Sequence, residues 1–127
     1  MRTIAVVEDN ADNRLLLQAI LDGQYSLVEY DNGIDALAGL NASLPELVLL
    51  DISLPGMDGN EILIRIRADE NLRHLPVIAL TAHAMSGDRE KYLAAGFNDY
   101  ITKPIVDETI LLGAIERWLP AGGGRLG

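Results

Sequence analysis

The sequence contains no cysteine, which excludes disulfide bridges and thiolate metal sites. Basic residues are scarce: 10 Lys and Arg stand against 19 Asp and Glu, and the formal net charge is −9. Because non-specific binding to nucleic acid relies on Lys and Arg, this balance argues against a nucleic-acid partner. No apolar run approaches the roughly 20 residues that span a bilayer. The first apolar run follows MRT directly, so we expect no signal peptide. These absences predict a cytoplasmic location and no membrane partner.

What is present is typical of one globular domain. The chain has 127 residues, of which 49% are hydrophobic and 23% charged. We expect a domain over residues 1–119, because Pro120 should stop the last helix. The remaining segment, PAGGGRLG at 120–127, has little to bury and is expected to be a flexible tail.

Short apolar runs alternate with helical patterns along the whole domain. The predicted strands are residues 4–7, 26–30, 47–50, 77–80 and 99–102. The predicted helices run from Asp12 or Asn13, as the cap, to 22, and over 33–41, 58–68, 86–95 and 106–119. Alternation of this kind predicts an α/β fold with helices on both faces of a parallel sheet. We expect a flavodoxin-like (βα)5 three-layer sandwich of strand order 2-1-3-4-5, with the alternating run 26–30 at the edge.

Polar residues follow four of these strands directly. Glu8 and Asp9 come after the first strand, Asp51 after the third, Thr81 after the fourth and Lys103 after the fifth. In a sheet of this order, ligands bind beyond the carboxyl ends of the strands, between strands 1 and 3. We therefore expect the five side chains to share one rim.

Three acids at one rim need a compensating cation. Two carboxylates about 4 Å apart repel by roughly 4 kcal/mol at an effective dielectric near 20. Lys103 supplies one positive charge, whereas a hard divalent ion supplies two and prefers oxygen ligands. Mg²⁺ is typically held by one or two carboxylates, waters and a phosphate oxygen. The sequence therefore predicts a Mg²⁺ site, with Mn²⁺ as a substitute.

The segments VVEDN, LLDISLPGMDG, ALTAHAM and YITKPI, in this order and spacing, resemble the receiver domain of two-component response regulators. The resemblance covers about residues 3–119. It implies that Asp51 accepts a phosphoryl group from a histidine kinase or a phosphotransfer protein. It also implies that Glu8, Asp9, Asp51 and the backbone carbonyl of Ser53 bind Mg²⁺.

The resemblance further implies that Thr81 and Lys103 bind the phosphoryl oxygens and that Tyr100 changes rotamer together with Thr81. The backbone N–H of Ala82 is expected as an additional donor, and the Lys103–Pro104 peptide bond is expected to be cis. Phosphoryl transfer needs positioning and charge stabilisation more than covalent chemistry, and Asp51 is the nucleophile. We thus expect a signalling phosphoacceptor that catalyses only its own phosphorylation and dephosphorylation.

A downstream protein is expected on the surface formed by residues 86–95, 99–102 and 106–119. The chain is expected to act by protein contact, as a stand-alone regulator or as a receiver of a hybrid kinase.

Two other features of the sequence have more than one interpretation. His83 lies two residues after Thr81, and we favour an exposed histidine over a residue that touches the phosphoryl site. Leu15, Leu16 and Leu17 span about 200° of helix, so not all three can face the sheet.

Three other functions share parts of this pattern. A flavin mononucleotide module would need hydroxyls and free N–H groups in the first loop, where EDNADN offers carboxylates. A phosphatase with an aspartate nucleophile usually has a second acid two residues later, where this chain has Ser53. A pseudo-receiver would bind a partner without phosphorylation, although retention of all five rim residues argues against it.

Overall fold

The computed structural model describes residues 2–82, 88–105 and 107–119. Strands and helices alternate in these parts of the chain: β1 (Thr3–Val7), α1 (Ala11–Leu21), β2 (Ser26–Tyr30), α2 (Gly33–Ala42), β3 (Leu47–Asp51), α3 (Gly59–Ala68), β4 (Val77–Thr81), α4 (Asp88–Ala95), β5 (Asp99–Thr102) and α5 (Glu108–Trp118). The five strands form one parallel sheet in the order β2-β1-β3-β4-β5. The predicted flavodoxin-like order is therefore confirmed.

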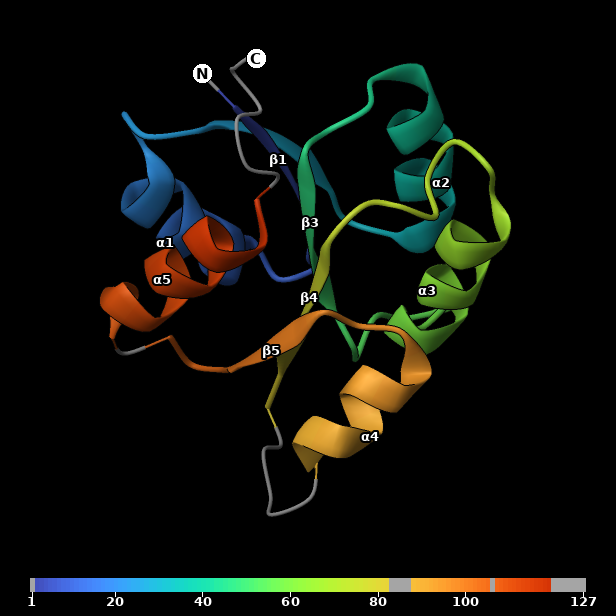
Figure 1. Cartoon of the computed structure of the whole chain (residues 1–127). Coiled ribbons are helices and arrows are strands. Elements are labelled where there is room, and N and C mark those ends of the chain that lie inside the picture. Colours follow the sequence, from blue (N-terminus) through green and yellow to red (C-terminus); the bar gives the residue numbers. More distant parts are fainter. Residues whose placement is uncertain (1, 83–87, 106, 120–127) are drawn as a thin grey trace.

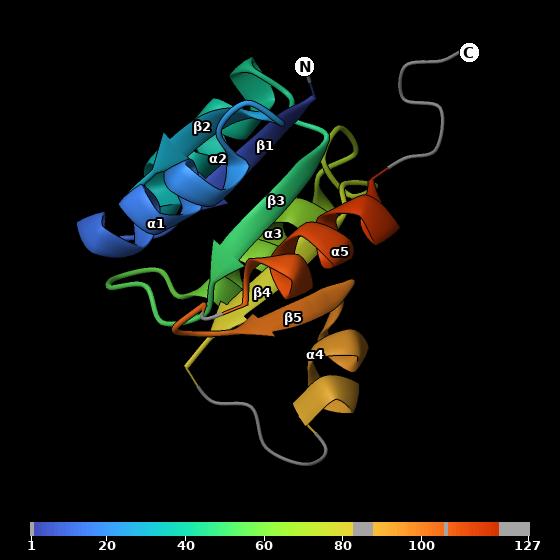
Figure 2. The same ribbon diagram turned by 90° about the vertical axis from the view of Figure 1, so that its left-hand side faces the viewer.

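Helices cover both faces of the sheet, which gives three layers (Figures 1 and 2). Helices α1 and α5 lie on one face, and α2, α3 and α4 lie on the other (Figure 1). Strands β1, β3 and β4 are almost entirely buried, whereas β2 is only partly buried, as expected at an edge. Buried strands of this kind carry continuous apolar runs because both of their faces are covered.

Each sheet face has its own core. The core under α2, α3 and α4 includes Val7, Leu50, Ile62, Leu63, Ile66, Val77, Ala79, Tyr92 and Phe97. The core under α1 and α5 includes Val6, Leu17, Leu21, Leu49, Leu80, Leu111 and Ile115. Leu17 is buried, while Leu15 and Leu16 are 60% and 37% exposed. The prediction that only part of the leucine triplet faces the sheet is confirmed.

One predicted helix start was wrong. Helix α1 begins at Ala11, and its cap is Asn10 rather than Asp12 or Asn13. The side chain of Asn10 accepts a hydrogen bond from the backbone N–H of Asn13 at 3.0 Å. Asn and Asp are almost equal as caps, so the sequence alone did not distinguish them. The earlier start brings the first turn of α1 directly over the end of β1.

The other boundaries agree within two residues where the structure describes them. Three strands include one more residue than predicted, namely Thr3, Asp51 and Thr81. The predicted start of the fourth helix at Ser86, the start of the fifth at Val106 and the tail 120–127 lie outside the described residues. Within the described parts of the chain, no helix combines the length and the apolar character that crossing a membrane requires.

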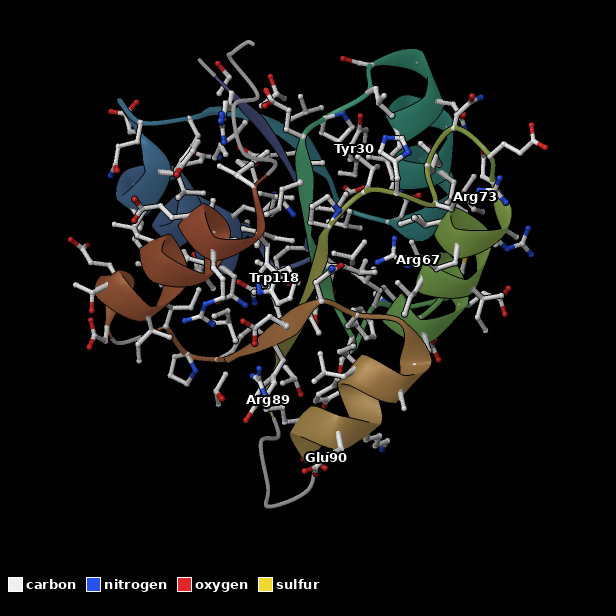
Figure 3. The ribbon with its side chains drawn as sticks, viewed as in Figure 1. Tyr30, Arg67, Arg73, Arg89, Glu90 and Trp118 are labelled. Atoms are coloured by element: carbon white, nitrogen blue, oxygen red, sulfur yellow. The ribbon has the colours of Figure 1, made fainter. Side chains whose placement is uncertain are left out.

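A half-buried arginine binds the segments that precede the amino-terminal ends of β4 and β5. Arg67 of α3 donates to the carbonyl oxygens of Arg73, Leu75 and Gly96 at 2.7–2.8 Å and to Asn98 Oδ1 at 3.0 Å (Figure 3). Burial lowers the pKa of the Arg67 guanidinium. These bonds hold the starts of β4 and β5, and so help to set where both strands end.

Candidate functional site

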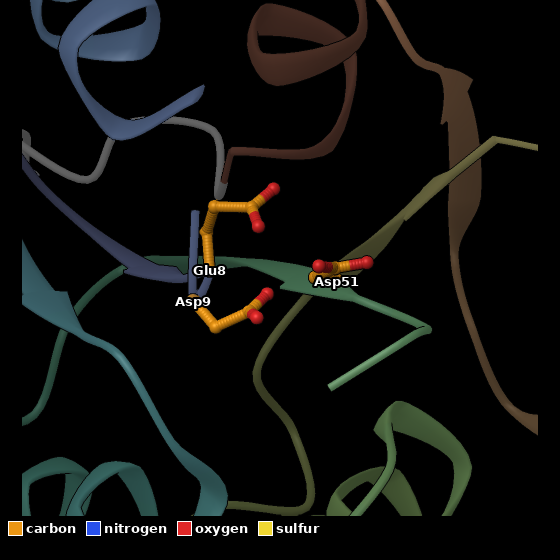
Figure 4. Close-up of side chains that lie close together, drawn as sticks. All are labelled: Glu8, Asp9 and Asp51. Carbon is orange, nitrogen blue, oxygen red and sulfur yellow. The ribbon is translucent and has the colours of Figure 1, made fainter. Parts of the chain in front are cut away.

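The three predicted acids come together at the carboxyl ends of β1 and β3. Glu8 and Asp9 follow β1, Asp51 ends β3, and the two strands are neighbours. One carboxylate oxygen of each residue lies within 4.8 Å of the others (Figure 4). Glu8 is fully buried and Asp51 is 2% exposed, whereas Asp9 is exposed. The cluster is therefore a mostly buried acidic site with one solvent-facing acid.

The first turn of α1 holds Glu8 in place. Its Oε2 accepts a bond from the Asn10 backbone N–H at 3.1 Å, and its Oε1 accepts one from Asn13 Nδ2 at 3.3 Å. Arg14 Nη1 donates to the backbone carbonyl oxygen of Glu8 at 2.7 Å. The sequence analysis did not identify Asn13 and Arg14. Their spacing from Glu8 becomes informative only once the helix is known to begin at Ala11.

Lys103 joins both buried acids from the end of β5. Its Nζ lies 3.2 Å from Glu8 Oε1 and 3.1 Å from Asp51 Oδ1, and its side chain is 16% exposed. Burial lowers the pKa of Lys103, but hydrogen bonding and attraction to Asp51 and Glu8 outweigh burial, so the net shift is upward. The ammonium therefore stays charged. The Lys103–Pro104 peptide bond is cis, as predicted.

Lys103 does not fully offset the charge on the two buried acids. The pKa of Glu8 is raised, first because burial desolvates the carboxylate and then because Asp51 lies beside it. Oxygen ligands in close proximity and an uncompensated buried charge are the conditions that a hard divalent cation satisfies. The residues present therefore fit Mg²⁺ or Mn²⁺.

The raised pKa of Glu8 has a consequence for stability. Between the ordinary value of 4.5 and the folded-state value, the folded protein binds more protons than the unfolded chain, so stability falls as pH rises. In the presence of a chelator at neutral pH, the free energy of unfolding of Glu8→Gln should therefore exceed that of the wild type by about 1 kcal/mol, measured by urea denaturation. The gain should disappear below pH 4.5. Lower stability of Glu8→Gln than of the wild type at neutral pH would contradict this prediction.

The loop after β3 fixes the Asp51 carboxylate. The backbone N–H of Ser53 donates to Asp51 Oδ1 at 3.0 Å, and that of Gly59 donates to the Ile52 carbonyl oxygen at 3.0 Å. A Cβ added to Gly59 would lie 2.6 Å from the Asp51 carbonyl oxygen. Glycine thus allows α3 to begin against the end of β3. Ser53 is exposed, and the role of its carbonyl as a metal ligand stays a prediction.

Thr81 ends β4 and is 3% exposed. Its Oγ1 accepts a hydrogen bond from the hydroxyl of Tyr92, in α4, at 3.0 Å. Tyr100 of β5 is half-buried, and its ring lies 5.5 Å from that of Tyr92, at 41°. The family resemblance pairs Thr81 with Tyr100, and nothing in the sequence marks Tyr92 as its partner. Ala82 is exposed beside Thr81 and its role as a donor stays a prediction, while His83 lies outside the described residues.

A buried carboxylate joins the elements of the predicted docking surface. Asp99, at the start of β5, is 5% exposed. Arg89 of α4 bonds to its Oδ1 at 3.1 Å, whereas Arg117 and Trp118 of α5 bond to its Oδ2 at 3.2 and 3.0 Å (Figure 3). Helices α4 and α5 therefore both contact the same carboxylate of β5.

Two curated proteins are similar to this chain in sequence. The sensor histidine kinase GacS of Pseudomonas protegens is 40% identical over an alignment of 119 residues, and the match covers 91% of this chain. The chain spans only 13% of the length of GacS. The polar-differentiation response regulator DivK of Brucella anthropi is 39% identical over 105 residues, and the match covers 82% of this chain and 85% of DivK.

Two solved structures of related proteins share this fold over most of the chain. The receiver domain of the sensor histidine kinase PA1611 of Pseudomonas aeruginosa has a TM-score of 0.82 and 39% identity, with 92% of this chain and 96% of that chain covered. That crystal structure has a magnesium ion coordinated in the active site cleft. The Mn²⁺-bound form of the response regulator Rcp1 has a TM-score of 0.79 and 28% identity, with 95% and 96% covered.

The family model for the response regulator receiver domain matches residues 4–116, which include every strand end described above. Together with the strand order and the acidic cluster, this match decides the family. The chain belongs to the receiver domains of two-component response regulators.

Proposed function

We propose that this chain is a phosphorylatable switch of a two-component system or phosphorelay, and that Asp51 is the phosphoacceptor. The observation that carries the proposal is the position of Asp51. Its buried carboxylate lies 3.1 Å from Lys103 Nζ and beside the carboxylates of Glu8 and Asp9. As in its kinase-linked relatives, the donor would be a histidine kinase or a phosphotransfer protein. That donor class also favours the cytoplasm as its location.

The reaction is a displacement at phosphorus. An Asp51 carboxylate oxygen attacks the phosphoryl group, a new P–O bond forms, and the P–N bond to the donor histidine breaks with its electron pair left on the imidazole. Lys103 Nζ, already 3.1 Å from Asp51, is placed to stabilise one phosphoryl oxygen. The Thr81 hydroxyl and the Ala82 N–H are the donors proposed for the others.

Glu8, Asp9, Asp51 and the Ser53 carbonyl would hold the metal ion. Bound Mg²⁺, or Mn²⁺ in its place, would supply two positive charges that offset those of the acids and of the phosphoryl oxygens. The raised pKa of Glu8 supports this assignment, since it marks a carboxylate without full compensation.

We infer that the signal leaves through Thr81 and Tyr100. Phosphorylation would draw the Thr81 hydroxyl toward the phosphoryl group, and Tyr100 would turn into the vacated space. To shift the population from about 1:99 to 99:1, the phosphoryl group must favour the active state by about 5.5 kcal/mol. Two to four charge-assisted hydrogen bonds of roughly 1.5–3 kcal/mol each, depending on their strength, supply this difference. The surface of α4, β5 and α5 would then bind a downstream protein.

Thr81→Ala should accept a phosphoryl group on Asp51 but fail to transmit it. On phosphorylation, the amide chemical shifts around Tyr100 should change strongly in the wild type and by a small fraction of that in the variant. Thr102→Ala is the matched control, because Thr102 lies opposite Thr81 in β5 and is exposed. Equal shifts in wild type and Thr81→Ala would show that the coupling does not run through Thr81.

The proposal is tested by intact mass after incubation with acetyl phosphate and Mg²⁺. The wild-type chain should gain the mass of one phosphoryl group, lose it in base, and gain none in the presence of a chelator. No gain with Mg²⁺ would favour a pseudo-receiver. Steady turnover of a generic phosphomonoester would favour a phosphatase with an aspartate nucleophile instead.

A further inference from the structure

We propose that Tyr92 is a positioning residue that holds Thr81 away from Asp51 in the unphosphorylated protein. The bond from the phenol of α4 and a bond to the phosphoryl group then require different orientations of the Thr81 side chain. This inference rests on the proposed phosphorylation of Asp51 and deepens it, since it names a residue that sets how easily the switch is thrown.

The contact that carries the proposal is buried and specific. Tyr92 is 8% exposed and Thr81 is 3% exposed, and the phenol hydroxyl donates to Thr81 Oγ1 at 3.0 Å. A hydrogen bond between two buried hydroxyls fixes both side chains, because breaking it leaves polar groups away from water. The bond joins the end of β4 to the second turn of α4.

The direction of the effect follows from the alternation of the strands. Val77 and Ala79 of β4 belong to the core under α2, α3 and α4. Thr81 continues this alternation, and the bond from Tyr92 confirms that its hydroxyl faces α4. Asp51 is held instead by Lys103 and by the N–H of Ser53. To reach a phosphoryl group on Asp51, the Thr81 side chain has to turn about its Cα–Cβ bond, and this turn breaks the bond to Tyr92.

Release of Tyr92 reaches the proposed docking surface directly. Its ring packs edge-on against Phe97, with centroids 6.0 Å apart at 86°, and lies 5.5 Å from the ring of Tyr100. A phenol that loses Thr81 in this buried place has to rearrange its other contacts or move toward water. Either response shifts α4 relative to β5. Tyr92 therefore couples the state of Thr81 to α4 as well as to Tyr100.

The test is the affinity for beryllofluoride, a phosphoryl mimic, in the presence of Mg²⁺. Tyr92→Phe keeps the ring and removes the hydroxyl, so the resting state loses one hydrogen bond. We expect the variant to bind beryllofluoride about two- to tenfold more tightly than the wild type. Tyr25→Phe is the matched control: Tyr25 precedes β2 at the opposite edge of the sheet, and its affinity should equal that of the wild type.

A double-mutant cycle isolates the bond itself. In a Thr81→Val background, Tyr92→Phe should no longer change the affinity, because the accepting hydroxyl is gone. Equal or weaker binding by Tyr92→Phe alone would overturn the proposal. So would an undiminished gain in the Thr81→Val background. A general loss of packing would weaken binding, so tighter binding excludes that explanation.

Hydrogen exchange without any phosphoryl mimic separates this inference from the proposed function. The amides of α4, Asp88–Ala95, should exchange faster in Tyr92→Phe than in the wild type or in Tyr25→Phe. Unchanged exchange would contradict the tether. If the wild type itself fails to bind beryllofluoride, the proposed role of Asp51 fails, and the exchange of α4 still decides whether Tyr92 holds Thr81.

Discussion

Asp51→Asn is expected to gain no phosphoryl group from acetyl phosphate and Mg²⁺, under conditions in which the wild type gains one. An amide oxygen is a far weaker nucleophile than a carboxylate, and the substitution also removes one negative ligand from the metal site. Asp51 is 2% exposed and held by Lys103 and Ser53. Asn keeps nearly the same shape, so the fold should survive. Intact mass before and after base treatment measures the result.

The matched control for this variant is Asp58→Asn. Asp58 caps α3 in the same loop, and its side chain accepts a bond from the Glu61 N–H at 3.0 Å. Asn caps a helix about as well as Asp, so the control should be phosphorylated like the wild type. Labelling of Asp51→Asn at full stoichiometry would place the phosphoacceptor elsewhere and refute the site assignment.

The second large effect concerns the metal. The double variant Glu8→Gln, Asp9→Asn should bind Mg²⁺ about 100-fold more weakly or not measurably. Loss of a single supporting partner of a metal ligand already costs 10- to 100-fold in affinity, and this variant removes two of the three carboxylates in the cluster. Titration calorimetry measures the affinity directly. Phosphorylation by acetyl phosphate should fall with it.

Asp12→Asn is the control for the metal variant. Asp12 is an exposed acid in the first turn of α1, so its substitution removes one negative charge near the same rim of the sheet. Its Mg²⁺ affinity should change little, because exposed charges outside the cluster are screened by solvent and salt. Wild-type affinity in the double variant would show that Asp51 alone, or a different site, holds the ion.

The rim of the site was predictable because two features of the sequence locate the carboxyl ends of the strands and bring them together. A continuous apolar run ends where a polar residue begins, and a parallel sheet brings all carboxyl ends to one edge. Glu8, Asp9, Asp51 and Lys103 could therefore be placed together before any coordinates were known. The contacts of Lys103 with Glu8 and Asp51 at 3.2 and 3.1 Å agree with that placement.

Other contacts were not predictable because they depend on where a helix starts and how it is rotated. Asn10, Asp12 and Asn13 are all suitable caps by residue type, and the choice of Asn10 decides that Asn13 and Arg14 contact Glu8. In the sequence, Tyr92 is one residue of a short predicted helix, and nothing there indicates which element its hydroxyl contacts. Only the packing of α4 against β4 and β5 turns its hydroxyl to Thr81.

By itself, the sequence determined the α/β class, the strand order, the acidic rim and the family to which it belongs. The class and the acidic rim follow from periodicity and from residue order at strand ends, which are local properties of the chain. The strand order follows from the rules for parallel sheets, and the family follows from the resemblance of four segments to receiver domains. The tertiary structure alone decided which groups touch: Arg14 on the Glu8 carbonyl, Arg89 and Arg117 on Asp99, and Tyr92 on Thr81. Such contacts join residues on different elements, and their geometry depends on helix rotation and packing, which no local pattern records.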